Sequence, residues 1–209
     1  KVDTDRSLAN SLDLSLSSPN KYFGFLAINQ SLSIDQDLYD RVHAFSLNPA
    51  TGTIEDNEEN KVAARHTFSY SASANTKIYG VVAPGIGDIQ AIRHVVTPSL
   101  SFSYRPDFSA KAWGYYTYLQ DTSGRTVKRD RFGGTTGSGG SQMVSLSVRN
   151  LFQMKRGSGE KVKKIDLFNM DFSTSYNFRA EQYRLSDLRT SWQANPARNF
   201  SLSASTGHS

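Results

Sequence analysis

Hydrophobic and polar residues alternate along much of this chain, and the clearest run of alternation extends from Ile92 to Tyr104. One face of this run carries five apolar or aromatic residues with a histidine and a proline, whereas the other face is mainly serine, threonine and arginine. Because side chains alternate along a β-strand with a period of two, the run predicts a long strand with one apolar face. Its thirteen residues exceed the length of about 5–6 that is common in strands and suffice for the roughly 9–11 that a tilted membrane strand needs.

The same alternation recurs through the chain and predicts eight strands, at residues 7–17, 21–36, 66–79, 92–104, 142–154, 164–178, 184–194 and 199–206. Composition predicts tight turns at 18–20 and 195–198, a polar loop at 37–65 and a glycine-rich loop at 105–141. The two longest connections leave the same edge of an antiparallel meander, as long loops do in outer-membrane barrels. The predicted fold is therefore all-β, an antiparallel meander of about eight long strands that is part of a transmembrane β-barrel.

A soluble β-sandwich also produces alternation, because the apolar faces of its two sheets pack together. Strand length favours the membrane barrel, and so do aromatic residues near the strand ends, since barrels carry aromatic girdles at both membrane interfaces. These aromatic residues are Tyr22, Tyr70, Tyr104, Tyr176, Phe178 and Trp192. A soluble or fibrous β-sheet protein is the alternative.

Composition narrows the class further. Hydrophobic residues make up 37% of the 209 residues, cysteine is absent, and the net charge is +5. No apolar run reaches the roughly 18 residues of a transmembrane helix. The basic residues do not form a stripe interleaved with aromatic residues, so nucleic acid is not an expected partner. The chain opens at Lys1 without an initiator methionine or a signal peptide, so we expect a mature chain or an excerpt of a longer one.

The sequence offers no catalytic constellation. None of the four histidines pairs with another at metal-ligand spacing, and no Gly-x-Ser-x-Gly elbow is present. The glycine tract at 133–140 lacks the lysine of a phosphate loop and predicts a mobile loop. The acidic residues Glu55, Asp56, Glu58 and Glu59 lack EF-hand spacing, which favours a solvated acidic loop. We therefore expect no enzyme activity, no metal and no cofactor.

Other features invite a specific interpretation. Pro98 lies in mid-strand without an N–H to donate, which predicts a bulge or local opening between strands or, equally, an edge strand. His94 falls on the apolar side and is interpreted as structural. Basic residues in the glycine-rich connection are a hypothetical contact for phosphates of an anionic lipid surface, and these are Arg125, Lys128, Arg129 and Arg131.

Two strings of residues carry a family resemblance. The first runs from 93 to 108 and continues with Trp113-Gly114-Tyr115-Tyr116, and the second joins 172–178 with 184–188. Together they resemble the barrel region of lipopolysaccharide-assembly proteins of the LptD (OstA, Imp) family, in the form found in Bacteroidetes and Chlorobi. The family motif in the first string consists of Arg93, His94, Pro98, Tyr104 and Pro106.

The resemblance implies a translocon that inserts lipopolysaccharide into the outer leaflet of the Gram-negative outer membrane. Family members combine a barrel of about 26 strands with a periplasmic β-jellyroll, which receives lipid from a bridge protein of the LptA kind. A lipoprotein of the LptE kind plugs the barrel lumen. The implied partners are therefore lipopolysaccharide, outer-membrane lipid, the plug and the bridge. Since this chain has fewer strands and lacks the jellyroll, residues 1–209 are expected to be a segment of the outer-membrane β-barrel domain.

Two other functions are alternatives. One is a different outer-membrane barrel, such as a porin or a receptor, which needs a complete, closing set of strands. The other is a soluble or surface β-sheet module that binds glycans, which folds without detergent.

Overall fold

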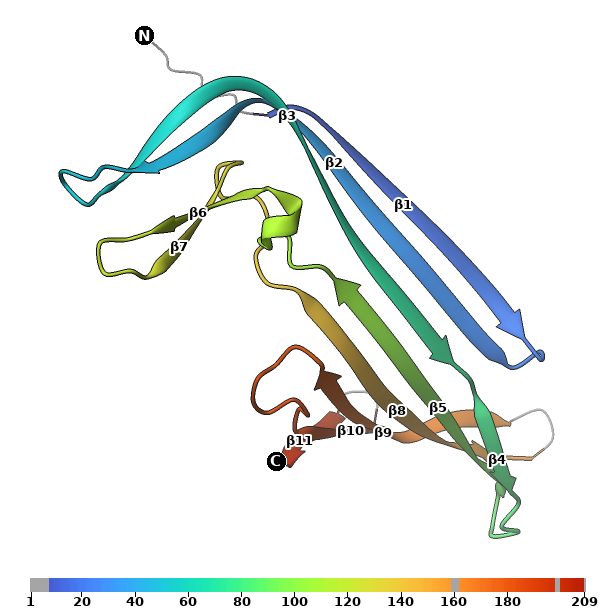
Figure 1. Ribbon diagram of the computed structural model, residues 1–209. Helices are drawn as coiled ribbons and strands as arrows, with labels where there is room; N and C mark the ends of the chain where they lie inside the picture. Colours follow the sequence, from blue (N-terminus) through green and yellow to red (C-terminus); the bar gives the residue numbers. More distant parts are fainter. Residues whose placement is uncertain (1–7, 159–161, 198–199, 209) are drawn as a thin grey trace. The chain divides into compact units, whose positions relative to one another are not determined.

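The computed structural model describes residues 8–158, 162–197 and 200–208. Within these ranges the chain forms eleven β-strands and one short 3₁₀ turn (Figure 1). The long strands are β1 (Leu8–Tyr22), β2 (Leu26–Leu47), β3 (Ile54–Asn75), β5 (Ile89–Arg105), β8 (Ser141–Arg156), β9 (Lys163–Asn177), β10 (Leu188–Ala197) and β11 (Phe200–His208). The short elements are β4 (Ile78–Val82), η1 (Lys111–Trp113), β6 (Tyr116–Gln120) and β7 (Thr126–Asp130).

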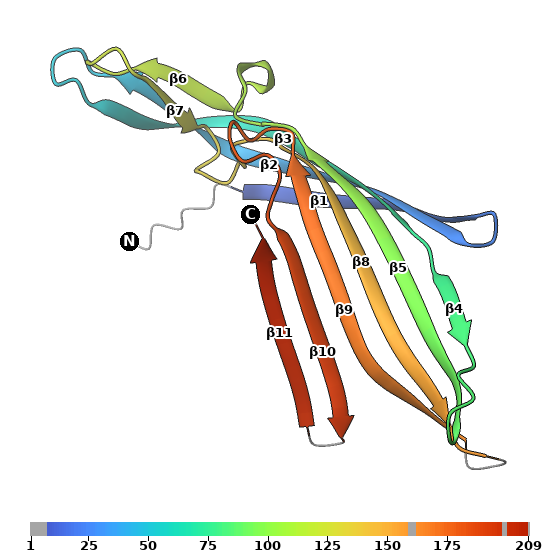
Figure 2. The same ribbon diagram turned by 90° about the horizontal axis from the view of Figure 1, so that it is seen from below.

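Eight of the strands follow one another in a sheet of order β1-β2-β3-β5-β8-β9-β10-β11. β4 adds a pairing on β5, and β6 and β7 form a separate two-stranded sheet. Figure 2 shows β5, β8, β9, β10 and β11 side by side, and every register from β8 to β11 is antiparallel. The predicted all-β antiparallel meander of long strands is therefore confirmed, with a strand order that is open at β1 and at β11 in the described part of the chain.

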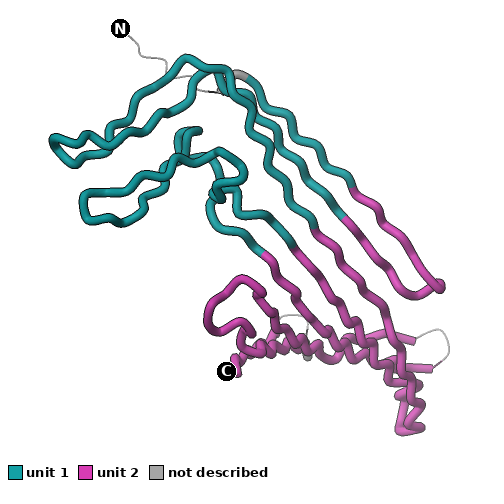
Figure 3. Tube along the Cα trace, viewed as in Figure 1, with its two compact units in different colours: residues 1–16, 31–70, 104–141 teal, residues 17–30, 71–103, 142–209 magenta. Residues whose placement is uncertain are grey.

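The chain divides into two compact units, and β2 and β3 each contribute to both (Figure 3). Unit 1 comprises residues 1–16, 31–70 and 104–141, and unit 2 comprises residues 17–30, 71–103 and 142–209. Unit 1 therefore contains most of the β2–β3 hairpin together with the connection from β5 to β8. Unit 2 contains β4, β9, β10 and β11 and most of β5 and β8.

The first turn differs from the prediction. A turn at 18–20 is wrong, because β1 continues through Pro19 to Tyr22. Proline is tolerated there because β1 lies at the end of the strand order, where a missing N–H need not break a ladder. The chain reverses instead at Phe23 and Gly24, whose φ angles are 52° and 75°. Glycine adopts this left-handed backbone without steric cost, which explains the position of the turn.

The predicted polar loop at 37–65 is also wrong. β2 continues to Leu47 and β3 begins at Ile54, so only the turn between them remains. The polar residues of this segment pair across the hairpin, with Arg41 Nη1 2.9 Å from Glu58 Oε2 and His43 Nδ1 2.8 Å from Asp56 Oδ1. Opposite charges on facing strands stabilise a sheet, so a stretch rich in charged residues can still be a strand. The acidic cluster thus belongs to β3 rather than to a loop.

The glycine-rich connection is more ordered than a mobile loop, because it folds back onto β2. Tyr39 and Val42 of β2 pack against Phe108, Tyr115 and Phe132 of the connection, and all five side chains are buried. The ring centroids of Tyr39 and Phe132 lie 4.8 Å apart, and those of Tyr115 and Phe132 lie 5.6 Å apart. The aromatic residues of the connection therefore form the core of unit 1.

Candidate functional site

Unit 2 carries an apolar face across β8, β9, β10 and β11. One row across these strands consists of Asn150, Met170, Trp192 and Ala204, and the next consists of Phe152, Phe168, Ala194 and Leu202. Leu146, Trp192 and Leu202 of this face are 44%, 48% and 53% exposed. Large apolar side chains that stay exposed over several neighbouring strands mark a surface that contacts lipid or another protein.

The opposite face of the same strands is polar. Ser147 of β8 faces Ser173 of β9, which in turn faces Arg189 of β10. In the next row, Arg149 Nε lies 2.8 Å from Asp171 Oδ1. A groove of about 660 Å³ runs over these strands, and Leu146 also borders it. Its polar lining includes Ser145, Ser147, Ser173, Ser175, Asp187 and Arg189. Such a hydroxyl-rich surface can exchange hydrogen bonds with sugars, because each hydroxyl both donates and accepts.

Arg93 of the family motif belongs to the polar side of unit 2. Its guanidinium donates to Gln153 Oε1, with Nε at 2.9 Å and Nη2 also in contact. Gln153 is buried, and its Nε2 donates to Asp166 Oδ1 at 2.5 Å. The guanidinium also lies 6.0 Å from the centroid of the Tyr79 ring. Arg93 therefore begins a polar chain that crosses β5, β8 and β9.

His94 belongs to the apolar side. Its ring stacks on Phe152 at 4.1 Å between centroids, and Phe152 stacks on Phe168 at 4.4 Å. His94 Nε2 lies 3.0 Å from Asn150 Oδ1, and Asn150 Nδ2 donates to the Met170 carbonyl at 3.3 Å. The imidazole thus packs as an aromatic ring, while its Nε2 is a hydrogen-bond partner of the Asn150 side-chain amide.

Pro98 lies inside the sheet, so the edge-strand alternative is wrong. β5 pairs with β3 and β4 on one side and with β8 on the other. The Thr76 N–H donates to the Pro98 carbonyl at 3.3 Å, and Thr76 falls in the interruption between β3 and β4. In an antiparallel ladder, the N–H and C=O of a residue point to the same neighbour. The missing donor of Pro98 therefore faces the interruption between β3 and β4, where the Thr76–Pro98 hydrogen bond still joins the two segments.

The other two motif residues belong to unit 1. Tyr104 is half-buried near the end of β5, and Pro106 is buried directly after the strand. Next to them, the Asp107 carboxylate accepts hydrogen bonds from the Ser109 hydroxyl at 2.6 Å, the Ser109 N–H at 2.9 Å and the Gly139 N–H at 2.9 Å. Asp107 therefore ties the start of the connection to its glycine tract.

The same bonds set the protonation of this carboxyl group, which lies outside the long strands. The hydrogen bond from the Ser109 hydroxyl holds the pKa of Asp107 below its ordinary value, against the opposing effect of burial. The backbone N–H groups of Ser109 and Gly139 and the charge of Lys128 lower this pKa further. Asp107 is thus an anionic acceptor at neutral pH.

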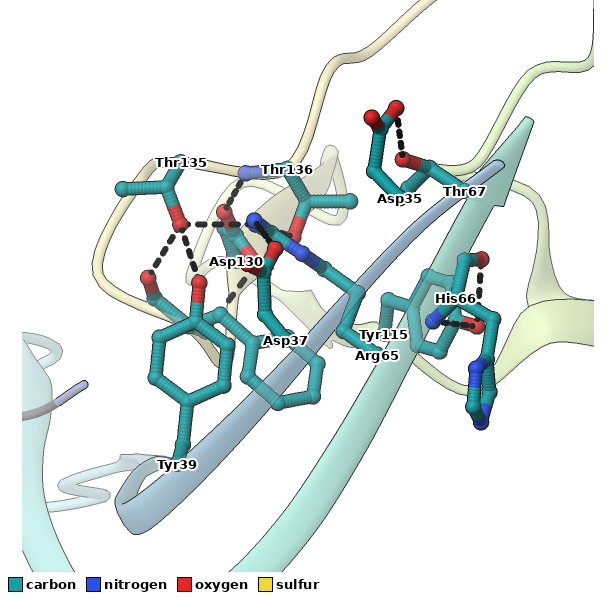
Figure 4. A network of polar contacts seen from close by, with 11 residues as sticks. Asp35, Asp37, Tyr39, Arg65, His66, Thr67, Tyr115, Asp130, Thr135 and Thr136 are labelled. Carbon is teal, nitrogen blue, oxygen red and sulfur yellow. Dashed lines mark hydrogen bonds and ion pairs between the residues drawn. The ribbon is translucent and has the colours of Figure 1, made fainter. Parts of the chain in front are cut away.

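A second polar cluster holds the end of the connection against the β2–β3 hairpin (Figure 4). The buried Arg65 guanidinium contacts the Asp37 carboxylate and donates to the hydroxyls of Thr135 at 2.7 Å and Thr136 at 3.0 Å. The Asp130 carboxylate accepts the N–H of Thr136 at 2.7 Å. These bonds fix the tract that the sequence predicted to be mobile.

The four basic residues proposed for phosphate contacts do not form one cluster. Their partners are Asp121 at 3.1 Å for Arg125, the Ser109 hydroxyl at 3.3 Å for Lys128 and the Gly114 carbonyl at 3.1 Å for Arg131. Arg129 is exposed on β7. Lys128 and Arg131 therefore hold the connection together, whereas Arg125 pairs with Asp121 at the surface and Arg129 is exposed.

Three sets of contacts were not predicted from the sequence. They are the Arg65–Asp37 ion pair, the hydrogen bonds that Asp107 accepts, and the hydrogen bonds of Gln153 with Arg93 and Asp166. Arg65 and Asp37 fall at the two limits of a segment predicted as loop, and only strand pairing brings them together. Asp107 followed by Ser109 is a recognisable signal, because an aspartate often accepts the backbone N–H two residues ahead of it.

Two further searches concern the described residues only. None of them belongs to a helix that is both long and apolar enough to cross a bilayer. Among them, no three side chains of histidine, cysteine, aspartate or glutamate lie together as metal ligands.

A family model described as LptD protein matches residues 3–209, which is almost the whole chain. No curated protein and no solved structure matches the chain.

Proposed function

Because the chain belongs to the LptD protein family, whose members serve lipopolysaccharide transport and assembly at the outer membrane, we propose that it forms part of the wall of a lipopolysaccharide translocon. In this proposal residues 1–209 are a segment of the outer-membrane β-barrel domain of a Gram-negative cell. The translocon inserts lipopolysaccharide into the outer leaflet and performs no chemical reaction on it.

The observation that supports this proposal most strongly is the division of unit 2 into two faces. Leu146 and Trp192 on one face are about half exposed, while serine, asparagine and arginine occupy the other. In membrane barrels the apolar face contacts lipid and the polar face lines the lumen. The 15 residues of β9 and the 16 of β8 exceed the roughly 9–11 that a tilted strand needs to cross the membrane.

These two faces suit an amphiphilic cargo. The hydroxyl-lined groove along β8 and β9 offers hydrogen bonds to the sugars of lipopolysaccharide. The acyl chains of the same molecule prefer the lipid beyond the apolar face, because exposing them to water is unfavourable. A wall that separates these environments lets the head group travel through the lumen until the lipid can leave sideways.

Loop lengths suggest the orientation. β2 has 22 residues, about twice the roughly 9–11 residues that a membrane crossing needs. Long loops of outer-membrane barrels lie on the cell surface and short turns lie in the periplasm. We infer that the β2–β3 turn and the 106–140 connection face the cell surface, where Arg125, Lys128, Arg129 and Arg131 can meet lipopolysaccharide phosphates.

The remaining partners follow from the family. A plug lipoprotein of the LptE kind would contact the polar face, and a periplasmic bridge protein of the LptA kind would deliver the cargo. Outer-membrane lipid would cover the apolar face. A porin or receptor and a soluble glycan-binding module are weaker proposals, because neither accounts for the family match over residues 3–209.

The assignment of the faces can be tested with introduced cysteines, since the chain has none of its own. Ser147→Cys and Leu146→Cys are neighbours on opposite faces of β8. In the full protein in native outer membranes, with other cysteines replaced, we expect the Ser147→Cys thiol to react with a water-soluble maleimide. A fluorophore at Leu146→Cys should instead be quenched by brominated lipid. Equal reactivity of both thiols would refute the proposed wall.

The cargo is tested by depletion. Loss of the full protein should remove lipopolysaccharide from the cell surface, measured by labelling intact cells with an antibody against its sugars. Unchanged surface labelling after depletion would refute the translocon and favour another outer-membrane barrel.

A further inference from the structure

The polar face of unit 2 contains a cavity of about 370 Å³. The proposed function gives this cavity no role. It lies near the ends of β8 and β9 that their short connection joins, and its lining includes Val81, Ala91, Arg93, Gln153, Lys155 and Lys164. Three of the eight lining residues are cationic, and four are apolar. The small side chain of Ala91 leaves room between them.

Two of the cations face each other directly. The register of β8 and β9 pairs Lys155 with Lys164, two positions beyond the pair of Gln153 and Asp166. Because positions two apart share a face, both lysines lie on the same side as Gln153. Neither lysine makes an ion pair within the described residues, and like charges placed directly opposite each other destabilise a sheet. The pair therefore carries a cost that an anion between the two ammonium groups would relieve.

Arg93 adds a third cation with a fixed direction. Gln153 binds its Nε and Nη2 groups and is itself held by Asp166, so the guanidinium cannot swing freely. Asp166 is the one carboxylate in this chain of contacts among the described residues, which leaves three cations against a single anion. A guanidinium held at one edge still has donors to offer, and Arg matches the geometry of phosphate oxygens.

We propose that this cavity binds a phosphate group, with Lys155, Lys164 and Arg93 as its cationic partners. Apolar walls from Val81 and Ala91 border the cations, so the site suits a phosphate attached to a less polar body better than a free ion. A phosphorylated glycolipid and inorganic phosphate share this chemistry. That the glycolipid is the natural source rests on the proposed function, whereas the cationic site itself does not.

The test is a binding measurement on the full protein purified in detergent. The probes are the lipid anchor of lipopolysaccharide carrying its phosphates, the same anchor after enzymatic dephosphorylation, and inorganic phosphate as competitor. The Lys155→Gln/Lys164→Gln variant should bind the phosphorylated anchor about tenfold or more weakly, because charge-assisted bonds to phosphate are among the stronger polar contacts. Ala91→Leu should weaken binding by filling the cavity, with every charge retained.

Lys163→Gln is the matched control. Lys163 pairs with Arg156, one position from Lys164, so its side chain lies on the opposite face of the strand. This variant loses a positive charge at the same end of β9 and should bind the phosphorylated anchor like the unaltered protein. Heat-dependent mobility in gel electrophoresis verifies that each variant is folded.

The outcomes separate cleanly. Loss of binding on dephosphorylation, together with dependence on Lys155 and Lys164, supports the site. Competition by inorganic phosphate at low concentration then points to a free anion as a natural occupant, and its absence points to the glycolipid. Equal binding of both anchors, or equal loss in the Lys163→Gln control, overturns the site. If surface lipopolysaccharide depends on the full protein but not on these lysines, only this inference fails and the proposed function stands.

Discussion

Replacing Arg65 with methionine should release the glycine-rich connection from the β2–β3 hairpin. Arg65 contacts the Asp37 carboxylate and the hydroxyls of Thr135 and Thr136, and its side chain is only 9% exposed. Methionine retains much of the volume between the rings of Tyr39 and Phe132, which lie 5.3 and 5.7 Å from the guanidinium carbon. The substitution therefore removes the charge and its donors more than the packing.

The size of the effect follows from the carboxylate left behind. Removing one partner of a buried ion pair costs about 3–5 kcal/mol, because the other charge stays buried without compensation. The Asp37 side chain is 15% exposed and can recover some hydration, so a cost of about 2–3 kcal/mol is the better expectation. That cost makes opening of the connection about 30- to 150-fold more frequent.

Amide hydrogen exchange on the full protein in detergent measures this opening. The N–H groups of Phe132 and Thr136 donate to Asp130 at 3.0 and 2.7 Å, so both should exchange faster in Arg65→Met by about the stated factor. Arg125→Met is the control, because Arg125 is 81% exposed and pairs with Asp121 on the surface. Such exposed pairs contribute about 0–1 kcal/mol.

A second substitution separates the ion pair from general damage. Asp37→Leu added to Arg65→Met removes the uncompensated carboxylate, and an apolar pair of this kind can be as stable as the ion pair it replaces. The double variant should therefore exchange more slowly than Arg65→Met alone. The amides of Phe132 and Thr136 could exchange equally slowly in Arg65→Met and in Arg125→Met. In that case the contacts of Arg65 do not hold the connection against the β2–β3 hairpin. If the double variant exchanges faster than the single one, the lost packing of the two side chains matters more than their charges.

Three other substitutions test separate features. Pro98→Ala supplies the missing donor opposite Thr76, so the new amide should be protected from exchange, and an unprotected amide would contradict the inference that this position faces the interruption between β3 and β4. The pKa of Asp107 is lowered in the folded state, so its stabilisation of the connection is complete above the ordinary pKa of 3.8 and is lost as the pH falls through the lower folded pKa. Exchange in unit 1 should accelerate over that acidic range, and Asp107→Asn should remove this dependence. His94→Leu removes the partner of the Asn150 amide oxygen and should lower the free energy of unfolding in urea by about 1–3 kcal/mol. His94→Leu/Asn150→Leu should restore most of it, whereas an equal loss in both variants would mean that the stacked ring matters and the hydrogen bond does not.

Alternation predicted the strands that have two different faces. The predicted bounds of 142–154 and 164–178 lie within two residues of those observed for β8 and β9. In these strands a shift of the pairing register by one residue would turn every apolar side chain to the polar side. The alternation in the sequence therefore specifies the register. The family string around Pro98 likewise falls in the strand where it was predicted, at an interruption of the neighbouring ladder.

Alternation fails where the apolar residues of a strand are irregularly spaced among charged ones. Residues 37–47 and 54–65 are strand, yet their sequence resembles a solvated loop because apolar residues such as Tyr39 and Val42 do not recur at every second position. Their stability depends on cross-strand pairs, such as Arg41 with Glu58, that become recognisable only when the pairing is known. The Arg65–Asp37 contact was unpredictable for the same reason, since 28 residues separate the partners. Prediction fails similarly for long connections that contain aromatic residues. These residues form a core against the β2–β3 hairpin, which the sequence does not identify.

The string from 93 to 108 extends past the end of β5, and the contacts at its end explain why. Arg105 Nη2 donates to the Gly139 carbonyl at 3.0 Å, and the Asp107 carboxylate accepts the Gly139 N–H. Phe108 is almost completely buried in the core of unit 1. A side chain at Gly137 would meet Arg105 Nη1 at 2.9 Å, so this arginine passes close to the tract. The last residues of the string therefore determine the fold of the connection, whereas its first residues determine the polar and apolar sides of the strand. Substitutions at the two ends should consequently have different effects. Those at 105–108 should alter amide hydrogen exchange in the connection, and those at 93–98 should alter the polar and apolar faces of the sheet.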